Sequence, residues 1–476
     1  MKRYQVGVAA SVALFFAISL GTTRDASAQR NDAGENAMQG LRFPHVSGSR
    51  NIRIASHLQV GGFMTTADIQ IEQERARPYV YLPRRDFVPW PQQPDGLPSK
   101  GVDIVSIKDL SHPRVIYSWR IEQQELHRPP GGLQNKYFKL KGRYYDVQSF
   151  QFQRGGPDVD LGAVVLDVTG LPDPGTVKEV GRIRVPDVPG GFHNVFAYKH
   201  SDGRVLLLAT TNGTVANVYD MEKFLAGDPK SGLIATIENP DTSGFFRGYH
   251  DFYVGYDPVT HQDRFYGAGY SGYYVFDVSD VTHAKLLTSI TGAAGTFLAH
   301  TITPEPTGRY VVTEMEYQYT PLRIFDLKPG LDGQVKTISR PIGAWEAHWD
   351  GDPHNHVVRW PYVFVSGYMD GLQVFNMMDP TNPYTVGHFY TCECTLAAGA
   401  EGAGQVGGMA GAFGVDVRNA DGLVVISDKR TGFWAFYMDG FDGWNGHQWG
   451  LPNISSAQDW DSGPEGAPKR TNVSAR

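Results

Sequence analysis

The segment EAHWDGDPHNH carries a carboxylate or an imidazole at every second position. These residues are Glu346, His348, Asp350, Asp352, His354 and His356. Such side chains can ligate a metal ion or transfer a proton, and alternate residues of an extended strand share one face. The Asp-Gly-Asp-Pro sequence in its middle is typical of a turn, which would interrupt a strand. We therefore expect either His354 or His356 to face the inside of the molecule, and Glu346 and His348 to lie on a rim.

Three further histidines stand at the starts of short apolar segments. They are His193 in GFHNVF, His250 in GYHDFYV and His300 in LAHTITP. Imidazole is a good ligand for zinc, copper, iron and nickel, and a carboxylate can orient it from behind. The question is therefore which elements could bring these histidines together.

An apolar phrase recurs along the chain and indicates those elements. It begins at a glycine or another turn residue, as in GYYVFDV at 272–278 and GLQVFNM at 371–377. Its seven copies begin at residues 101, 162, 213, 272, 321, 371 and 432. Other short β-branched or aromatic runs precede most copies, and Gly, Pro, Asp and Asn separate the runs, as is typical of strands and turns.

Helical periodicity is nearly absent, and MEKFLAG at 221–227 is the best short helix candidate. Four-stranded units that repeat radially form a β-propeller. We therefore predict an all-β, seven-bladed β-propeller of four-stranded antiparallel blades over residues 51–444. The last copy has no fourth strand after it, so residues 51–60 should supply that strand and close the ring, which removes an exposed sheet edge.

Two segments carry a resemblance to a known family. GYYVFDVSDVTHAKLL at 272–287 and GLQVFNMMDPTNPYTVGHF at 371–389 resemble LVIVD repeats. The resemblance extends over roughly residues 51–440, except for the Pro-rich stretch 84–100 and the segment 136–152, which lacks a histidine at its start. LVIVD repeats occur in secreted and cell-surface bacterial propellers, so the resemblance implies this fold and an exported protein, but no single reaction.

In a propeller, the innermost strands line the central channel and all begin on the same face. The strand-start histidines would then surround one axial cavity, and the second strands would bring acidic residues to it. The candidate metal ligands are His193, His250, His300, His354 and His356, the candidate catalytic residue is Glu314, and the expected rim residues are Asp251, Glu316, Glu346 and His348. Two interpretations stay open: a metal or ligand site, or polar channel residues that hold the blades together through hydrogen bonds.

Cys392 and Cys394, in the sequence CEC, are the only cysteines. Two cysteines cannot form a disulfide framework. A disulfide across one intervening residue would be strained and easily reduced. The pair is therefore a candidate disulfide, with soft copper ligation and redox chemistry as alternatives.

The N-terminal residues predict export. Lys2 and Arg3 precede the uncharged run 6–21, and the Ala-Ser-Ala sequence at 26–28 matches a signal-peptidase site. We expect residues 1–28 to be a signal peptide for the periplasm or beyond, with no membrane insertion. Segments 29–50 and 445–476 are expected to be mobile.

The charge of the chain excludes one class of partner. The formal net charge is −7, and an acidic surface without basic clusters repels nucleic acid. We favour an exported, monomeric propeller that binds a small-molecule or protein partner on its loop-rich channel face. The alternative is a histidine-ligated metalloenzyme of the oxidase or oxygenase type, with one copper, zinc or iron ion at the axis.

Overall fold

The computed structural model describes residues 48–61, 64–87, 100–127, 130–152, 156–243, 247–257, 259–296, 298–317, 319–348, 351–392, 409–446, 460–461 and 463. All of them belong to one compact unit, residues 45–476. The predicted signal peptide lies outside the described residues, as do most of the two terminal segments that we expect to be mobile.

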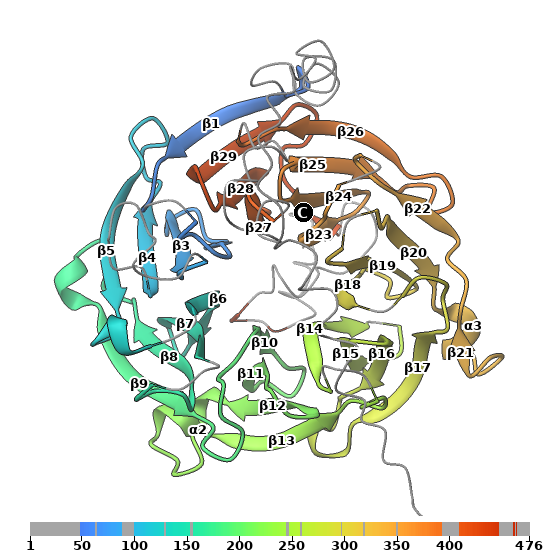
Figure 1. Cartoon of the computed structure of the whole chain (residues 1–476), viewed down its shortest axis with the longest axis horizontal. Coiled ribbons are helices and arrows are strands. Elements are labelled where there is room, and N and C mark those ends of the chain that lie inside the picture. The colour runs from blue at the N-terminus through green and yellow to red at the C-terminus, as the bar shows by residue number, and fades with distance from the viewer. Residues whose placement is uncertain are drawn as a thin grey trace, which may run out of the picture. The chain divides into compact units, whose positions relative to one another are not determined.

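The strands form seven sheets around a central axis, and each sheet is one blade (Figure 1). Blade 1 contains β2 (Gln70–Ile71), β3 (Tyr79–Arg84), β4 (Gly101–Ser106) and β5 (Arg114–Arg120). Blade 2 contains β6 (Pro130–Leu140), β7 (Arg143–Phe152), β8 (Leu161–Asp167) and β9 (Lys178–Arg184). Blade 3 contains β10 (Val195–Lys199), β11 (Val205–Thr210), β12 (Val215–Asp220) and β13 (Leu233–Glu238).

The remaining blades follow the same order from the inner strand to the outer strand. Blade 4 contains β14 (Tyr249–Asp257), β15 (Gln262–Gly269), β16 (Gly272–Asp277) and β17 (Lys285–Thr291). Blade 5 contains β18 (Ala299–Pro304), β19 (Tyr310–Met315), β20 (Leu322–Asp326) and β22 (Gly343–Trp345). Blade 6 contains β23 (Asn355–Arg359), β24 (Tyr362–Gly367), β25 (Gly371–Asn376) and β26 (Tyr384–Phe389). Blade 7 contains β27 (Ala412–Arg418), β28 (Leu423–Asp428), β29 (Gly432–Met438) and β1 (Ile52–Leu58). The predicted seven-bladed fold is confirmed.

The recurring apolar phrase forms the third strand of each blade. In β25, Leu372 and Val374 pack into the apolar cluster between blades 6 and 7, whereas Phe375 and Met377 pack into the cluster between blades 5 and 6. Successive side chains of a strand point to opposite faces. The phrase is apolar at nearly every position because both faces of a blade are covered by its neighbours.

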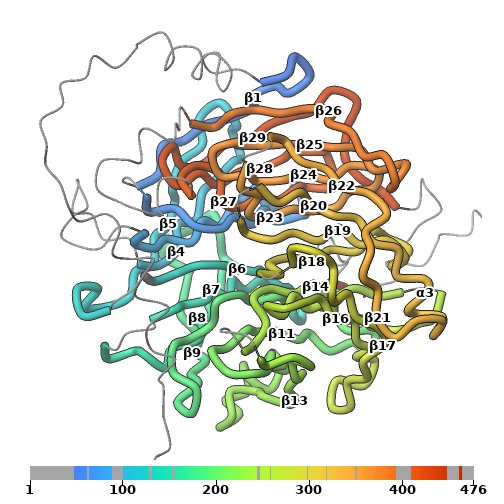
Figure 2. The backbone as a smooth tube through the Cα atoms, turned by 45° about the vertical axis from the view of Figure 1, so that its right-hand side comes forward, coloured from blue at the N-terminus to red at the C-terminus, as the bar shows by residue number. Residues whose placement is uncertain are grey.

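The N-terminal strand closes the ring, as the missing fourth strand of the last repeat predicts. β1 pairs antiparallel with β29, from Ile52 opposite Met438 to Leu58 opposite Phe433. It also lies beside β26 of blade 6 (Figure 2). The first strand of the ring therefore completes the last blade and covers the edge of β29.

Few elements depart from this plan. β21 (Thr337–Ile338) adds a parallel fifth strand to the outer edge of blade 4. The MEKFLAG segment forms the short helix α2 (Met221–Leu225), whose first turn is capped by the Asp220 side chain. The other helical turns are η1 (Gln124–Leu126), η2 (Pro174–Thr176), η3 (Val281–His283) and α3 (Lys328–Leu331). Within the described ranges, none of the helices has the length and apolar character needed to cross a membrane.

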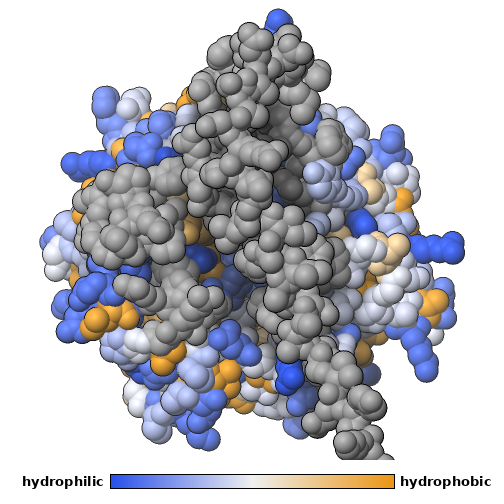
Figure 3. Space-filling view, in the orientation of Figure 1, coloured by the Kyte–Doolittle hydropathy of each residue, from blue (hydrophilic) through white to orange (hydrophobic). Residues whose placement is uncertain are grey.

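The outer rim of the ring carries mainly hydrophilic side chains in the view of Figure 3. Exposed apolar side chains such as Val259, Tyr319 and Tyr384 belong to three different blades. Apolar residues that are exposed singly are normal on a protein surface. The rim therefore gives no reason to place a binding site there, and the axis is the part to examine.

Candidate metal centre at the propeller axis

Four histidines from four neighbouring blades stand in a row around the axis. The ring centroids of His193 and His250 are 4.3 Å apart, those of His250 and His300 are 4.2 Å apart, and those of His300 and His354 are 5.0 Å apart. His250 and His300 belong to β14 and β18. His193 and His354 come just before β10 and β23. The repeat thus brings one imidazole per blade to the same position in blades 3 to 6.

β-Bulges direct two of these rings. In β14, Tyr249 pairs with Gly269 and Asp251 with Ala268, so His250 is an extra residue without a partner. His300 is the extra residue of the same irregularity in β18. A bulge removes a side chain from the normal alternation between two faces and re-aims it. The bulges therefore allow both histidines to face the channel rather than a neighbouring blade.

Glu314 supports the row from behind. It is fully buried on β19, where it lies opposite Thr301 in the ladder. Its Oε1 is 3.3 Å from Nδ1 of His300, and its Oε2 is 2.9 Å from Nδ1 of His356. The Thr301 hydroxyl is also 2.8 Å from Nδ1 of His300. Because both neighbours of this nitrogen can accept a hydrogen bond, we assign the hydrogen of His300 to Nδ1, which leaves Nε2 for another partner.

The Nε2 atoms of two histidines turn toward one carboxylate. His354 donates from Nδ1 to the Phe413 carbonyl at 2.6 Å, so its Nε2 is also free. Nε2 of His300 is 3.5 Å from Glu316 Oε2, and Nε2 of His354 is 3.8 Å from Glu316 Oε1. One ligand atom each from His250, His300 and Glu316 lies within 4.8 Å of the others. This is a compact set of two imidazoles and one carboxylate.

The environment separates the pKa values of the four histidines. Burial lowers the pKa of His193 to about 3, with Arg85 and His300 contributing, and lowers the pKa values of His250 and His354 well below the ordinary range. Burial also opposes protonation of His300, but Glu314 and Glu316 outweigh it and raise the His300 pKa to about 9. Without a metal ion, the row therefore carries one positive charge at neutral pH, on His300.

A small cavity adjoins the row. It has a volume of about 10 Å³ and is lined by His193, His300 and His354, among others. About one water-sized particle fits such a space. The cavity does not touch His250 or Glu316, which belong to the compact ligand set. His300 is therefore the only residue that belongs to both the cavity lining and the ligand set.

The structure places the remaining candidates in four different environments. His356 lies one layer deeper on β23, against Glu314, and does not join the row. Glu316, which we expected on the rim, faces the histidines, and Asp251 is buried in the channel wall below His250. Glu346 and His348 line a separate shallow pocket between blades 5 and 6.

The segment EAHWDGDPHNH is thus not one strand. β22 ends at Trp345, the Gly351 amide donates to the His348 carbonyl, and β23 begins only at Asn355. Asp350 lies outside the described residues, and so does Cys394. Cys392 is buried beside Met64 and Met369.

Glu316 and three residues that the sequence alone did not point to reach the site from one repeated position. Each directly follows the second strand of its blade: Arg85 after β3, Glu316 after β19, Tyr368 after β24 and Lys429 after β28. The Tyr368 hydroxyl donates to Glu316, and Nζ of Lys429 lies 4.4 Å from the centre of the Tyr368 ring. The repeat could have indicated these four residues, because they occupy equivalent positions in their blades.

Fold and site together define a seven-bladed β-propeller with a histidine–carboxylate cluster at its axis. A comparison of the chain with protein-family models gives no match, and a comparison with curated proteins also gives none.

Proposed function

We propose that this chain is an exported propeller, related to the LVIVD-repeat proteins, that holds one transition-metal ion among its axial histidines. It presents this ion and the surrounding face to a small-molecule or protein partner. The signal-peptide-like N-terminus and the repeat phrases support the export and family parts of the proposal. The metalloenzyme alternative requires the same ion, so a metal assay comes before any assay of activity.

The observation that carries the proposal is the shared orientation of two imidazoles. His300 and His354 both use Nδ1 for other partners and both turn Nε2 toward Glu316. The Nε2 atom of neutral His354 presents a lone pair to this carboxylate and is repelled by it, whereas Nε2 of protonated His300 carries a hydrogen toward Glu316 until a metal ion takes the place of that proton. A cation between them removes this repulsion, and hydrogen bonding of Nδ1 to a carboxylate or a carbonyl is typical of metal-bound histidine.

The residues favour a particular class of ion. His250, His300 and Glu316 would hold it, with His193 and His354 beside them and Glu314 orienting His300. Imidazole-rich sites with one carboxylate suit copper, zinc and iron rather than calcium or magnesium, which prefer oxygen ligands alone.

Protein exported to the periplasm and purified without a histidine tag should therefore contain about one transition-metal ion per chain. Mass spectrometry of the metal content of the native protein measures this directly. Metal-free protein should also take up one equivalent of at least one of copper, zinc, iron and manganese. Protein that is isolated without metal and then takes up none of the four would contradict the proposal.

Metal affinity should rise about tenfold for each pH unit between about pH 5 and pH 8. The reason is that one proton must leave His300 when the ion binds, and the pKa of His300 is about 9. His193, His250 and His354 are already neutral in this range, so they release none. Competition with a chelator of known affinity measures the slope of affinity against pH. A flat profile would remove His300 from the ligand set, and a hundredfold change per unit would mean that a second group also releases a proton.

A Glu314→Gln variant should bind the metal about 10 to 100 times more weakly than the native protein. The amide has the same size and can still accept one hydrogen bond, but it removes the negative charge behind His300 and His356. Glu346→Gln, at an exposed position away from the axis, is the matched control. Equal affinities for the two variants would show that Glu314 does not support a ligand.

A further inference from the structure

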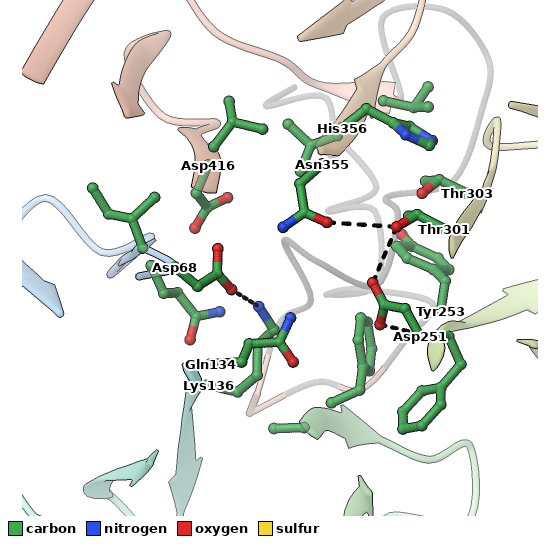
Figure 4. Close-up of a pocket in the computed structure, with 18 of the residues that line it drawn as sticks. Asp68, Gln134, Lys136, Asp251, Tyr253, Thr301, Thr303, Asn355, His356 and Asp416 are labelled. Carbon is green, nitrogen blue, oxygen red and sulfur yellow. Dashed lines mark hydrogen bonds and ion pairs between the residues drawn. The ribbon is translucent and has the colours of Figure 1, made fainter. Parts of the chain in front are cut away.

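A second and larger cavity lies on the axis beyond the histidine row, and we call it the axial cavity (Figure 4). Its volume is about 90 Å³. Asp68, Gln134 and Asn355 line both it and the small cavity against the histidines, so they form the layer between the two. Several water molecules, or one small organic molecule, fit a space of this volume.

Carboxylates dominate the polar wall. Asp68 and Asp416 approach the axial cavity from one side and Asp251 from the opposite side, and all three are buried (Figure 4). Lys136 is the only lysine or arginine among the lining residues that the structure describes. The wall therefore carries more negative than positive groups, which favours a cationic occupant.

Asp251 is the carboxylate without a direct ion pair, although the charges of His300 and Lys136 act on it from a longer distance. Asp68 lies 3.8 Å from Nζ of Lys136, and Asp416 lies 3.7 Å from the guanidinium of Arg359. Asp251 instead accepts hydrogen bonds from the Phe252 amide at 2.7 Å and the Thr301 hydroxyl at 3.3 Å. Within the described ranges it forms no ion pair, although it is only 8% exposed. Burial raises the pKa of Asp251, so its charged form is costly here unless a cation accompanies it.

The three carboxylates of the axial cavity are spaced too widely to bind one metal ion together. Among the described residues, His250, His300 and Glu316 form the only group of three acidic or histidine ligand atoms within 4.8 Å of one another. Asp68, Asp251 and Asp416 are therefore too far apart to share one ion, and an occupant that contacts several of them must be larger.

Aromatic rings provide the apolar part of the wall. Phe196 and Tyr253 stand next to each other, with ring centres 5.2 Å apart, and Phe252 lies beside them. Trp460 and Tyr137 contribute from another side, with ring centres 6.2 Å apart. Such rings accept the alkyl part of a ligand and attract a nearby cation.

We propose that the axial cavity binds a small organic cation with a primary ammonium group. The ammonium has three hydrogens to donate, and the carboxylate of Asp251 and the oxygen atoms around it provide acceptors. Its short alkyl part packs against Phe196 and Tyr253. This site is separate from the metal centre, and its occupation does not require the metal ion.

The test uses propylammonium as the probe, with 1-propanol and propionate as neutral and anionic comparisons. Isothermal titration calorimetry of the full chain should show binding of propylammonium alone, at one site per chain. With four heavy atoms the probe is limited to a dissociation constant of about 10⁻⁴ M or weaker. The titration is repeated on protein stripped of metal, where the affinity should change by less than about threefold, within the ordinary context dependence of a local effect.

Three variants locate the site. Asp251→Asn, which keeps the shape of the side chain, should weaken binding at least about tenfold, as expected for a charge-assisted hydrogen bond. Lys136→Met should strengthen binding, because it removes the competing cation from Asp68. Asp187→Asn, at an exposed position, should leave the affinity unchanged. Melting temperatures of the three variants show whether each one is folded.

Trp460 supplies a second readout. The probe should change the tryptophan fluorescence of the native protein, and a Trp460→Phe variant should lose this change while calorimetry still detects binding. Several outcomes would overturn the proposal: equal binding of 1-propanol, no binding of propylammonium, or unchanged affinity in folded Asp251→Asn protein. Native protein that contains no metal and takes none up, but still binds propylammonium, would contradict the proposed function alone.

Discussion

A His250→Ala, His300→Ala double variant should contain no bound metal and should keep the far-ultraviolet spectrum of a β protein. The substitutions remove two of the three side chains whose ligand atoms lie within 4.8 Å of one another. The loss should be complete at the metal concentrations of ordinary buffers, because Glu316 and a single neighbouring imidazole cannot replace two ligands. The fold should survive, since the apolar clusters between the blades contain neither histidine.

The matched control is a His112→Ala, His283→Ala double variant. Both of these side chains are 83% exposed and lie next to an aspartate, so the control removes two histidines without touching the axis. It should retain about one ion per chain. If both double variants keep their metal, the ion is bound elsewhere. If both lose it, the measured metal was bound non-specifically.

The fold could be predicted because its main signal is repeated seven times. The phrase that forms β16 and β25 is apolar on both faces, and this is a property of a strand that is covered on both sides. A single copy would be compatible with many buried strands. Seven copies, separated by turn residues and without helices between them, require a radial array.

The site could be predicted only in part. Strand alternation sets which face a side chain points to, but β-bulges and strand ends change that direction, and the sequence does not show where they occur. The repeat indicates that His250 and His300 begin innermost strands, and the structure places both in the row. The choice between His354 and His356 depended on where β23 begins. The strand begins at Asn355, so His354 precedes it and faces the axis, while His356 is inside the strand and faces Glu314.

Glu316 shows the same limit more clearly. In sequence it is two residues after Glu314, and two residues along a strand would place both on one face. β19 ends at Met315, however, so Glu314 remains behind the row while Glu316 turns into it. The end of a strand is the feature that sequence patterns locate least well, and here it decides which carboxylate faces the ring nitrogens.

Removal of β1, the strand that closes the ring, should destabilise the protein. A variant that begins at Val60 lacks β1 and leaves the hydrogen-bonding edge of β29 exposed. It also loses Ile52 from the cluster between blades 6 and 7, and Leu58 from the cluster between blades 7 and 1. Burial of two such side chains and the hydrogen bonds of the ladder together contribute about 5 kcal/mol or more.

The shortened protein should therefore melt at a markedly lower temperature and form oligomers through the free edge of β29. A variant that begins at residue 48, and so keeps every described strand, is the reference for thermal melting and size-exclusion chromatography. A synthetic peptide that covers residues 48–59 should restore the melting temperature by adding its strand to β29. If the protein without β1 is monomeric and melts with the reference, the ring does not depend on its N-terminal strand.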